Sequence, residues 1–452
     1  MGLGKTLQAI AAARLLHNLA GMNSCLVVCP KSVLDHWSHE LQKFAGETCT
    51  VVKGDANRRR RLYEAPTLFK TVTIESLRED FPAIGTPDLI IFDEVQKLAN
   101  VATLSNRVIQ SANSRFFFGL SGTAVATGLP DLYGVLKAMR APDLGRSLDF
   151  YASHVISDRF GKPCFTMNAG AFYVRHADCI LRRLKTEVEP NLPEIKITEV
   201  DLELSALQLE MARPLLVELE MVKERLELRY DTDDFNRSRW LINRIAELSD
   251  STALLDPTTN DSSKLTWLKE YLLSECFTDA DKVVIFTRWT RSQDLICKVC
   301  DEIGIGFETL RGESTLSERK NAIDRFKKDQ KVRAFVSTDA GGVGINLQFA
   351  RKVVIFEPSW SPSTDAQRIQ RVHRIGQKRA VEAVYLLTFL DSKFVLATHR
   401  KKLFSANAID ALRSPNRNSG LPTWPELCAV IRYYQECAKQ PDISPNFRSK
   451  KH

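Results

Sequence analysis

The sequence predicts an α/β protein in which two lobes, each built on a parallel β-sheet, are joined by a helical spacer. Three observations support this. Short apolar runs alternate with amphipathic helices in two separate regions, charged helical segments lie between those regions, and the chain opens on a glycine-rich turn followed by an apolar helix. With 452 residues, 44% hydrophobic and 26% charged, the chain has a globular composition and can bury two cores.

The first lobe is predicted over residues 1–140. An Ala- and Leu-rich helix follows the opening turn, and a second helix is expected around VLDHWSHELQKF. The expected strands are the apolar runs CLVVCP, KTVTI, DLIIFDE and FFFGLSG. Short continuous apolar runs between amphipathic helices are typical of strands that helices cover on both faces of a parallel sheet.

The same alternation predicts a second lobe over residues 263–403. Its expected strands are KVVIFT, VRAFVST, KVVIFE and VEAVYLLT, and its expected helices are KLTWLKEYLL, SQDLICKVCDEI, LSERKNAIDRF and the segment around DAQRIQRVH. Residues 141–262 are interpreted as a helical spacer without a core of its own, because long charged helical stretches dominate them. Residues 404–452 are interpreted as a solvated tail to which no function is assigned.

Composition and charge limit the class of protein. The chain has no apolar run of about eighteen residues and no signal-peptide pattern, which predicts a soluble intracellular protein without a membrane partner. The net charge of +8 permits a polyanion partner but also fits a basic enzyme. Cys297 and Cys300 have no second C-x-x-C pair, so we expect no structural zinc site but two buried thiols in a reducing compartment.

The opening run, MGLGKT, has the features of a phosphate-binding turn. Gly2 and Gly4 would let the backbone approach a phosphate, and the N–H groups of the turn and the helix would face the anion. Lys5 would neutralise the β- and γ-phosphate oxygens of ATP, and Thr6 would ligate Mg²⁺. A glycine-rich turn alone is weak evidence, whereas Gly-Lys-Thr followed by a helix is a stronger signal.

An acidic pair, Asp93 and Glu94, follows the apolar run of DLIIFDE. At the end of a buried strand Asp93 would hold Mg²⁺, usually through water, and Glu94 would polarise the attacking water. A surface Asp-Glu pair at a strand end would explain the motif if it stood alone. Its position after a phosphate-binding turn favours the second half of a nucleotide site.

Two arginines in the second lobe, Arg371 and Arg374, are three residues apart in QRIQRVHRIGQ. On a helix this spacing places both on one face, as a pair of arginine fingers reaching a γ-phosphate would require. An arginine-rich helix that faces solvent is the alternative. The residues around the pair favour the finger interpretation.

These motifs resemble those of the SWI/SNF-type ATPases of helicase superfamily two, over nearly the whole chain and in the family's order. The matching segments are MGLGKT, LVVCPKSVLDHW, DEVQ, LSGTA, VVIFTRW, LRGESTLSERKNAIDRF, STDAGGVGINLQFA and QRIQRVHRIGQ. The segment ILRRLKTEVEPNLP is similar to the family's link between the lobes. The number and order of the matches make a chance resemblance negligible.

The resemblance implies two RecA-like lobes that close on ATP and drive a DNA-stimulated ATPase along double-stranded DNA. By matching position it gives Gln367 the role of a γ-phosphate sensor beside the two arginines. The residues that would couple the nucleotide site to DNA are Gln96, Ser121, Thr123, Thr338, Asp339 and Gly341. Candidate contacts to DNA phosphates are Lys31, Arg288 and Arg311, although each is also explained as an ordinary surface base.

The position of Met1 bears on the first lobe. The family's motif reads Asp-Glu-Met-Gly-Leu-Gly-Lys-Thr, so Met1 falls where that internal methionine lies. We therefore expect a natural polypeptide that extends upstream, and a first lobe here that lacks the strand leading into its phosphate-binding loop. The alternative is a truncated or inactive ATPase that serves as a DNA-binding or scaffold protein.

The resemblance favours a role in DNA or chromatin remodelling, DNA repair or replication-fork processing, with nucleosomes or replication and repair proteins as partners. The short connection between LSGTA and ILRRLK favours a small repair or replication motor similar to annealing helicases. An RNA-directed helicase of the same superfamily is a further alternative, disfavoured by VHRIGQ and STDAGGVGINLQ. The expected location is the nucleus of a eukaryote, or the cytoplasm or nucleoid of a bacterium or virus.

Overall fold

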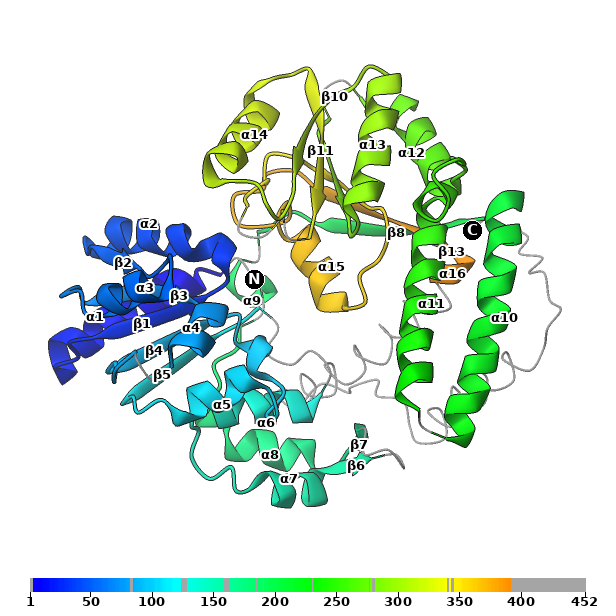
Figure 1. Ribbon diagram of the computed structural model, residues 1–452. Coiled ribbons are helices and arrows are strands. Elements are labelled where there is room, and N and C mark those ends of the chain that lie inside the picture. The colour runs from blue at the N-terminus through cyan, green and yellow to red at the C-terminus, as the bar shows by residue number, and fades with distance from the viewer. Residues whose placement is uncertain are drawn as a thin grey trace.

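Two parallel-sheet α/β lobes are present in the computed structural model, as predicted (Figure 1). The structure describes residues 3–81, 84–122, 128–157, 163–183, 185–189, 191–229, 231–275, 277–278, 281–339, 341–342 and 345–391. The tail predicted over residues 404–452 lies outside these ranges. No helix within them combines the length and apolarity needed to cross a bilayer.

The first lobe contains five parallel strands in the order β2-β3-β1-β4-β5. They are β1 (Cys25–Cys29), β2 (Cys49–Val51), β3 (Phe69–Thr73), β4 (Leu89–Asp93) and β5 (Phe116–Leu120). The helices are α1 (Lys5–Ala20), α2 (Leu34–Ala45), α3 (Ala56–Tyr63), α4 (Ile74–Asp80), α5 (Leu104–Ser111) and α6 (Leu129–Ala138), with 3-10 turns η1 (Lys31–Val33) and η2 (Val95–Leu98). Within the described residues, α1 is the first element and β5 is an edge strand.

Both faces of this sheet are covered, which explains the continuous apolar strands. All five residues of β1 are buried, and alternate side chains enter opposite cores. Val27 packs with α1 and α2, whereas Val28 packs with α4, α5 and α6. This arrangement brings the N-terminus of α1 and the carboxyl end of β4 to the same edge of the lobe.

The second lobe contains six parallel strands in the order β10-β11-β9-β12-β13-β8. They are β8 (Ile195–Leu202), β9 (Val283–Thr287), β10 (Gly306–Leu310), β11 (Val332–Thr338), β12 (Lys352–Ile355) and β13 (Val381–Thr388). One face is covered by α12 (Ser263–Leu273) and α13 (Thr290–Glu302), and the other by α14 (Leu316–Lys328) and the end of α15 (Pro362–Ile369). The short helix α16 (Phe389–Asp391) follows β13.

The predicted spacer, residues 141–262, is divided between the lobes. Its first part packs on α6, where Tyr133 and Phe150 stack with ring centroids 4.0 Å apart. This part contains α7 (Ser147–His154), α8 (Ala169–Arg175), the 3-10 turn η3 (Ala177–Cys179) and an antiparallel hairpin of β6 (Val155–Ser157) and β7 (Pro163–Thr166). The helix α9 (Lys185–Val188) lies in the segment that leads to the second lobe.

The strand β8 was not predicted, and it corrects the spacer interpretation. Figure 1 shows β8 alongside β13, and the two pair in parallel along all eight residues of β8. All eight of its residues are exposed or half-buried because β8 is an edge strand. It therefore lacks the continuous apolar run on which the strand predictions relied, and the strands β2, β6, β7 and β10 were likewise not predicted. The other predicted domain limits remain predictions.

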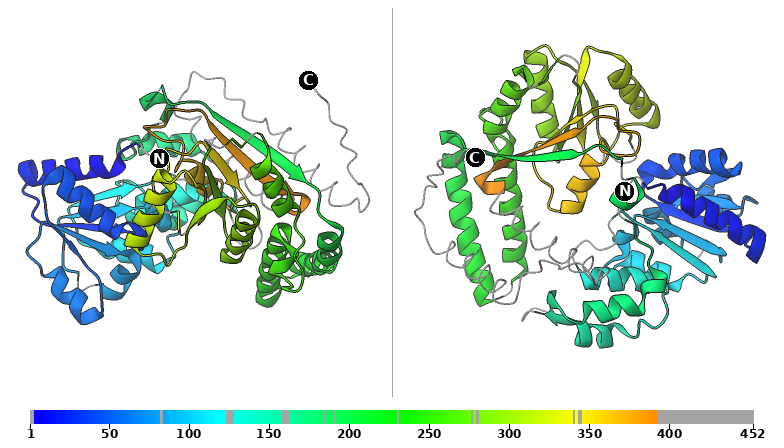
Figure 2. Two further views of the ribbon diagram at one scale, coloured as in Figure 1. Left: turned by 90° about the horizontal axis from the view of Figure 1, so that it is seen from above. Right: turned by 180° about the vertical axis from the view of Figure 1, so that it is seen from behind.

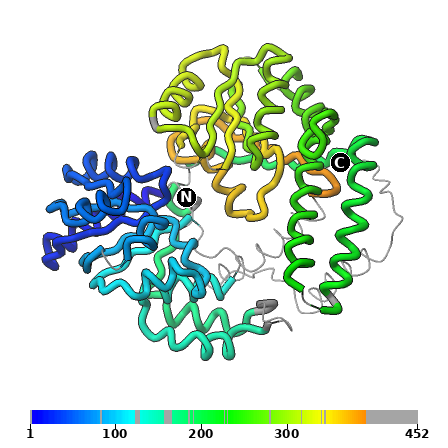
Figure 3. Tube along the Cα trace, in the orientation of Figure 1, coloured from blue at the N-terminus to red at the C-terminus, as the bar shows by residue number. Residues whose placement is uncertain are grey.

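The end of the predicted spacer forms a helical hairpin of α10 (Ala206–Leu228) and α11 (Thr232–Asp250), followed by η4 (Thr252–Leu254). Contrary to the spacer prediction, the hairpin has a small core of its own, in which Val222 of α10 and Ile245 of α11 are buried. Figure 2 shows it beside the second lobe, and Figure 3 follows the chain from the first lobe through the hairpin into the second. Leu390 joins this core and connects it to β13.

Candidate active site

The opening turn leaves the N-terminus of α1 open to an anion. Gly4 has φ 73°, a left-handed conformation that glycine adopts without strain. Among the described residues no side chain caps α1, and no acidic residue occupies its first turn. The first N–H groups of α1 therefore keep both their hydrogen-bonding capacity and the positive end of the helix dipole. Gly2 lies outside the described residues.

Lys5 is the first residue of α1, and charges from two other parts of the chain act on its ammonium group. Burial lowers the pKa of Lys5, the Glu94 and Asp93 carboxylates oppose that shift, and Arg371 adds to it. The predicted phosphate lysine, acidic pair and arginine finger are thus brought together from α1, β4 and the second lobe. Thr6 is the second residue of α1, and its side chain is half-buried.

Asp93 is the last residue of β4 and is held by two donors. Its Oδ2 accepts the indole N–H of Trp37 at 2.9 Å, and its Oδ1 accepts the backbone N–H of Glu94 at 3.0 Å. Burial raises the pKa of Asp93, whereas the Trp37 hydrogen bond and the Lys5 charge lower it. Sequence reasoning missed Trp37, because an aromatic residue on an amphipathic helix is ordinarily core.

Glu94 begins a hydrogen-bonded chain that reaches the end of β5. Its backbone has φ 58°, a conformation uncommon for a residue with a side chain and often found at functional sites. Its Oε2 accepts a hydrogen bond from the Gln96 amide, whose Oε1 accepts the Ser121 hydroxyl at 2.6 Å. The predicted coupling residue Gln96 therefore contacts the acidic pair directly, and Ser121 is joined to the pair through Gln96. Thr123 lies outside the described residues.

Arg371 and Arg374 are not on a helix, contrary to the prediction. The helix α15 ends at Ile369, and both arginines lie in the turns that follow. The chain leaves the helical path because the Arg371 carbonyl accepts the Leu347 N–H at 2.9 Å while Val372 is fully buried in the core. Burial lowers the pKa of both guanidinium groups, and Glu94 opposes the shift at Arg371.

One arginine of the pair, Arg374, retains hydrogen-bonding capacity. The Nε of Arg374 is buried and has no hydrogen-bond partner among the described residues. An unpaired buried donor costs free energy, about 1 to 3 kcal/mol, so a ligand that accepts from it would bind favourably. Gln367 is half-buried on α15, in the turn before Arg371.

The other predicted coupling residues lie at the end of β11. Asp339 Oδ1 accepts from Arg368 Nε at 2.6 Å, and Arg368 is itself buried on α15. The Thr338 hydroxyl accepts the Gly341 N–H at 3.3 Å. A Cβ on Gly341 would lie 2.4 Å from the Leu310 carbonyl oxygen, so only glycine fits there. Arg368, which sequence reasoning missed, thus joins the end of β11 to α15.

The three predicted DNA contacts differ in their surroundings. Lys31 is exposed at the start of η1, just before α2. Arg288 stacks on Trp289 and Trp360, with its Cζ 4.6 Å and 5.3 Å from the ring centroids. Arg311 pairs with Asp294 and also donates to Gln293. Lys31 is therefore the most open of the three to an anion, and the three roles remain predictions.

A buried charged cluster in the second lobe was not predicted. The Lys264 ammonium lies 3.0 Å from Asp250 and 2.8 Å from Asp391, and all three side chains are buried. Burial raises the pKa of Asp250 to about 6, because one ammonium group cannot fully compensate two carboxylates. The cluster ties α11, α12 and α16 together. Its members are far apart in sequence, so no local pattern could reveal it.

The thiols predicted to be buried lie on α13. Cys300 is buried and Cys297 half-buried, and both are free. Burial raises the pKa of each to about 12, which keeps the thiols protonated and unreactive at neutral pH.

The residues of the candidate site fit ATP with Mg²⁺. An open helix N-terminus and Lys5 suit the phosphates, Asp93 and Thr6 supply the oxygen ligands that Mg²⁺ prefers, and the unpaired Arg374 Nε suits a further anionic oxygen. When bound, Mg²⁺ neutralises charge on the β- and γ-phosphates. The Glu94 carboxylate opposes the lowering of the pKa of both Lys5 and Arg371, which places the three side chains in one region between the lobes.

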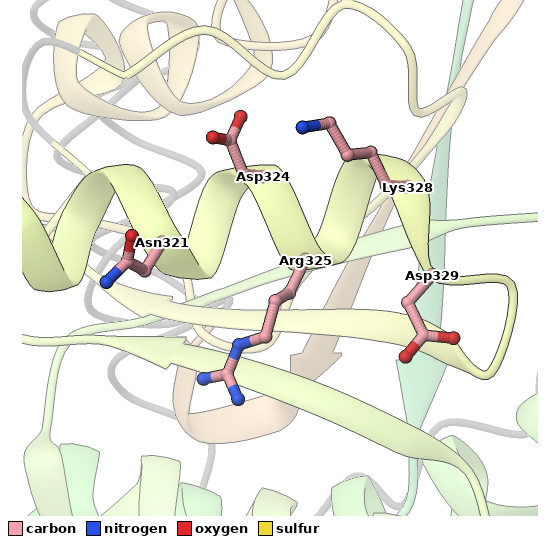
Figure 4. Close-up of a pocket in the computed structure, with 5 residues that line it drawn as sticks. All are labelled: Asn321, Asp324, Arg325, Lys328 and Asp329. Carbon is pink, nitrogen blue, oxygen red and sulfur yellow. The ribbon is translucent and has the colours of Figure 1, made fainter.

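An open surface hollow of about 610 Å³ lies elsewhere, on α14. Figure 4 shows its lining side chains, which are Asn321, Asp324, Arg325, Lys328 and Asp329. Arg325 forms an ion pair with Glu308 of β10 at 2.9 Å. None of the predicted site residues lines this hollow, and its mixed charges select no ligand.

Two family models match the chain. The model described as SNF2-related domain matches residues 1–233, and that described as Helicase conserved C-terminal domain matches residues 263–376. The first alone covers more than half of the chain.

Curated relatives have names connected with chromatin and DNA. Chromodomain-helicase-DNA-binding protein 1-like of Mus musculus is 28% identical over 410 residues, covering 86% of this chain and 44% of that protein. SWI/SNF-related matrix-associated actin-dependent regulator of chromatin subfamily A member 1 of Homo sapiens is 28% identical over 467 residues, covering 96% of this chain and 43% of that protein. The chain thus spans less than half the length of these relatives.

Among solved structures, the chain is similar to the Sulfolobus solfataricus SWI2/SNF2 ATPase core in complex with dsDNA. The two are 25% identical, the match covers 93% of this chain and 90% of that chain, and the TM-score is 0.42.

Proposed function

The chain belongs to the SNF2-related family, and from this premise we propose that it is an ATP-dependent translocase on double-stranded DNA. The observation that carries the proposal is the convergence of Lys5, Glu94 and Arg371 from two lobes at one edge of the first sheet. Such an arrangement makes hydrolysis depend on how the lobes sit against each other, which is what a motor requires.

In the proposed reaction the first lobe binds the nucleotide and activates the attacking water. The N–H groups of α1 and Lys5 hold the phosphates, while Thr6 and Asp93 would hold Mg²⁺. Glu94 orients the attacking water and accepts its proton. Because Glu94 receives a hydrogen bond from Gln96, the position of its carboxylate depends on the end of β5 through Ser121.

The second lobe completes the site. Arg371 would stabilise the charge that develops on the transferred phosphoryl group, and Arg374 and Gln367 would contact the γ-phosphate. Arg368 joins these residues to Asp339 at the end of β11, so a shift of that segment would move the fingers. This contact is a physical route by which DNA bound to the second lobe could regulate hydrolysis.

Double-stranded DNA is proposed as the polymer because the family relative of Mus musculus carries DNA-binding in its name and this chain has a net charge of +8. Contacts to phosphates, with Lys31 first among the candidates, would be nearly blind to sequence and weakened by salt. The names of the relatives favour nucleosomal DNA as the substrate over the repair and replication roles suggested by the short inter-motif connection.

The proposal is tested by ATP hydrolysis of the whole chain alone and with duplex DNA, single-stranded DNA or RNA, beside a K5A control. We expect duplex DNA to give the largest stimulation and K5A to abolish turnover. Displacement of a third strand from a DNA triplex then measures translocation. Stimulation by RNA alone would favour an RNA-directed helicase, and DNA binding without turnover would favour a scaffold, and either result would contradict the proposal.

A further inference from the structure

We propose that Trp37 is a positioning residue that fixes the Asp93 carboxylate for Mg²⁺ and links it mechanically to α2. The inference rests on the proposed function, since it needs Asp93 to be a ligand of the ion. The indole is fully buried, and its N–H donates to Asp93 Oδ2 at 2.9 Å. The donor and the acceptor are 56 residues apart in sequence, so only the tertiary fold brings them together.

The two hydrogen bonds of Asp93 prevent its carboxylate from turning. Oδ1 accepts the Glu94 N–H at 3.0 Å and Oδ2 accepts the Trp37 indole, and each donor is fixed, one by the backbone and one by a packed ring. An ionised carboxylate has about four acceptor positions, so about two remain for a cation or its bound water. Their direction is set in advance of binding, which reduces the reorganisation that binding would require.

Trp37 also connects this carboxylate to a segment with a different proposed task. Lys31, the exposed candidate for a DNA phosphate contact, begins η1, and η1 runs directly into α2. A displacement of this segment would therefore move the indole against Asp93. The hydrogen bond is thus a direct path between the DNA-facing surface of the first lobe and its Mg²⁺ ligand.

Core packing alone is the competing explanation. Trp37 lies in an apolar cluster with Ile10 and Ala13 of α1 and Leu41 of α2, and a buried indole N–H needs an acceptor in any case. If packing were the whole role, removing the N–H would lower stability without changing the requirement for Mg²⁺. The two explanations therefore differ in a measurable quantity.

The test compares W37F with W267F in the whole chain. Phenylalanine keeps much of the packing but has no donor, and Trp267, which stacks on Tyr271 in the second lobe, is a matched control. A fluorescent ATP analogue reports nucleotide binding as Mg²⁺ is titrated. We expect W37F to raise the Mg²⁺ concentration for half-maximal binding about tenfold, the value for one hydrogen bond to a charged group. Binding in EDTA should match that of the wild type.

A second measurement does not depend on the folding of W37F. In ¹⁵N-indole NMR spectra of the wild type, the Trp37 signal is identified as the one that moves in D93N, which retains the indole. We expect that signal to shift when Mg²⁺ is added with ADP but not when ADP is added with EDTA. A signal indifferent to Mg²⁺, or a W37F protein with the wild-type Mg²⁺ requirement, would overturn the positioning role alone. A wild-type chain without Mg²⁺-dependent nucleotide binding would overturn the proposed function as well.

Discussion

Glu94 and Arg371 come from different lobes, yet the Glu94 carboxylate lies close enough to oppose the lowering of the Arg371 pKa that burial causes. Opposite charges near each other favour their ionised forms. The Glu94 carboxylate therefore favours the charged form of the Arg371 guanidinium at the junction of the lobes. A nucleotide entering between them would meet both an acceptor for a water proton and a donor for a phosphoryl oxygen.

The Glu94 carboxylate can be neutralised with little change of shape. We expect E94Q to bind ATP within a few-fold of the wild type but to hydrolyse it about 10² to 10⁴ times more slowly, because the amide cannot accept a proton from water. Steady-state turnover and binding of a fluorescent ATP analogue separate the two effects. The exposed Glu75 provides a matched control, E75Q. Normal turnover in E94Q would assign the base to another residue.

Removal of the finger guanidinium should affect turnover more than binding. We expect R371A to lower kcat about 10³-fold, since an arginine finger acts chiefly on charge that develops in the transition state. K378A, which removes an exposed charge close by, should leave kcat unchanged. Single-turnover hydrolysis at saturating ATP is the measurement. A rise in KM with unchanged kcat would indicate ground-state binding instead.

The Ser121 hydroxyl belongs to the series of hydrogen bonds that begins at Glu94. We expect S121A to keep basal ATPase activity within about twofold while it lowers stimulation by DNA about fivefold, because it removes one hydrogen bond between Gln96 and β5. S111A, at an exposed serine, is the control. The measurement is ATPase activity with and without duplex DNA. Equal losses in both conditions would place Ser121 in catalysis rather than in coupling.

The buried Asp250 predicts a dependence of stability on pH. Its pKa is raised by burial to about 6 in the folded state, so the native protein binds more protons than the unfolded chain between about pH 4 and this value. This contribution to stability therefore falls as pH rises through that window. Relative to D250N, the wild type should lose about 1 kcal/mol between about pH 5 and about pH 7.

Urea unfolding at the two pH values measures this difference. D301N, at an exposed aspartate, should show no such change relative to the wild type. If D250N and the wild type kept a constant difference in stability, Asp250 would be ionised in both states throughout the window.

The sequence predicted the fold where each strand is buried on both faces. Apolar runs such as β1 and β9 could be identified because helices cover them completely. The edge strand β8 was missed because most of its exposed side chains are polar and interrupt the apolar run. The turns that carry Arg371 and Arg374 were predicted as helix because the local pattern is helical, whereas the contact between Arg371 and Leu347 is not local.

The sequence by itself determined the two α/β lobes and predicted the chemistry of the candidate site, because periodicity and short motifs such as MGLGKT and DLIIFDE are local properties of the chain. Only the tertiary structure decided which groups meet. It brought the Trp37 indole into a hydrogen bond with Asp93 and the Ser121 hydroxyl into one with Gln96. It also placed Lys264 between two buried carboxylates. These contacts depend on packing between segments distant in sequence, where burial makes each polar group require a partner.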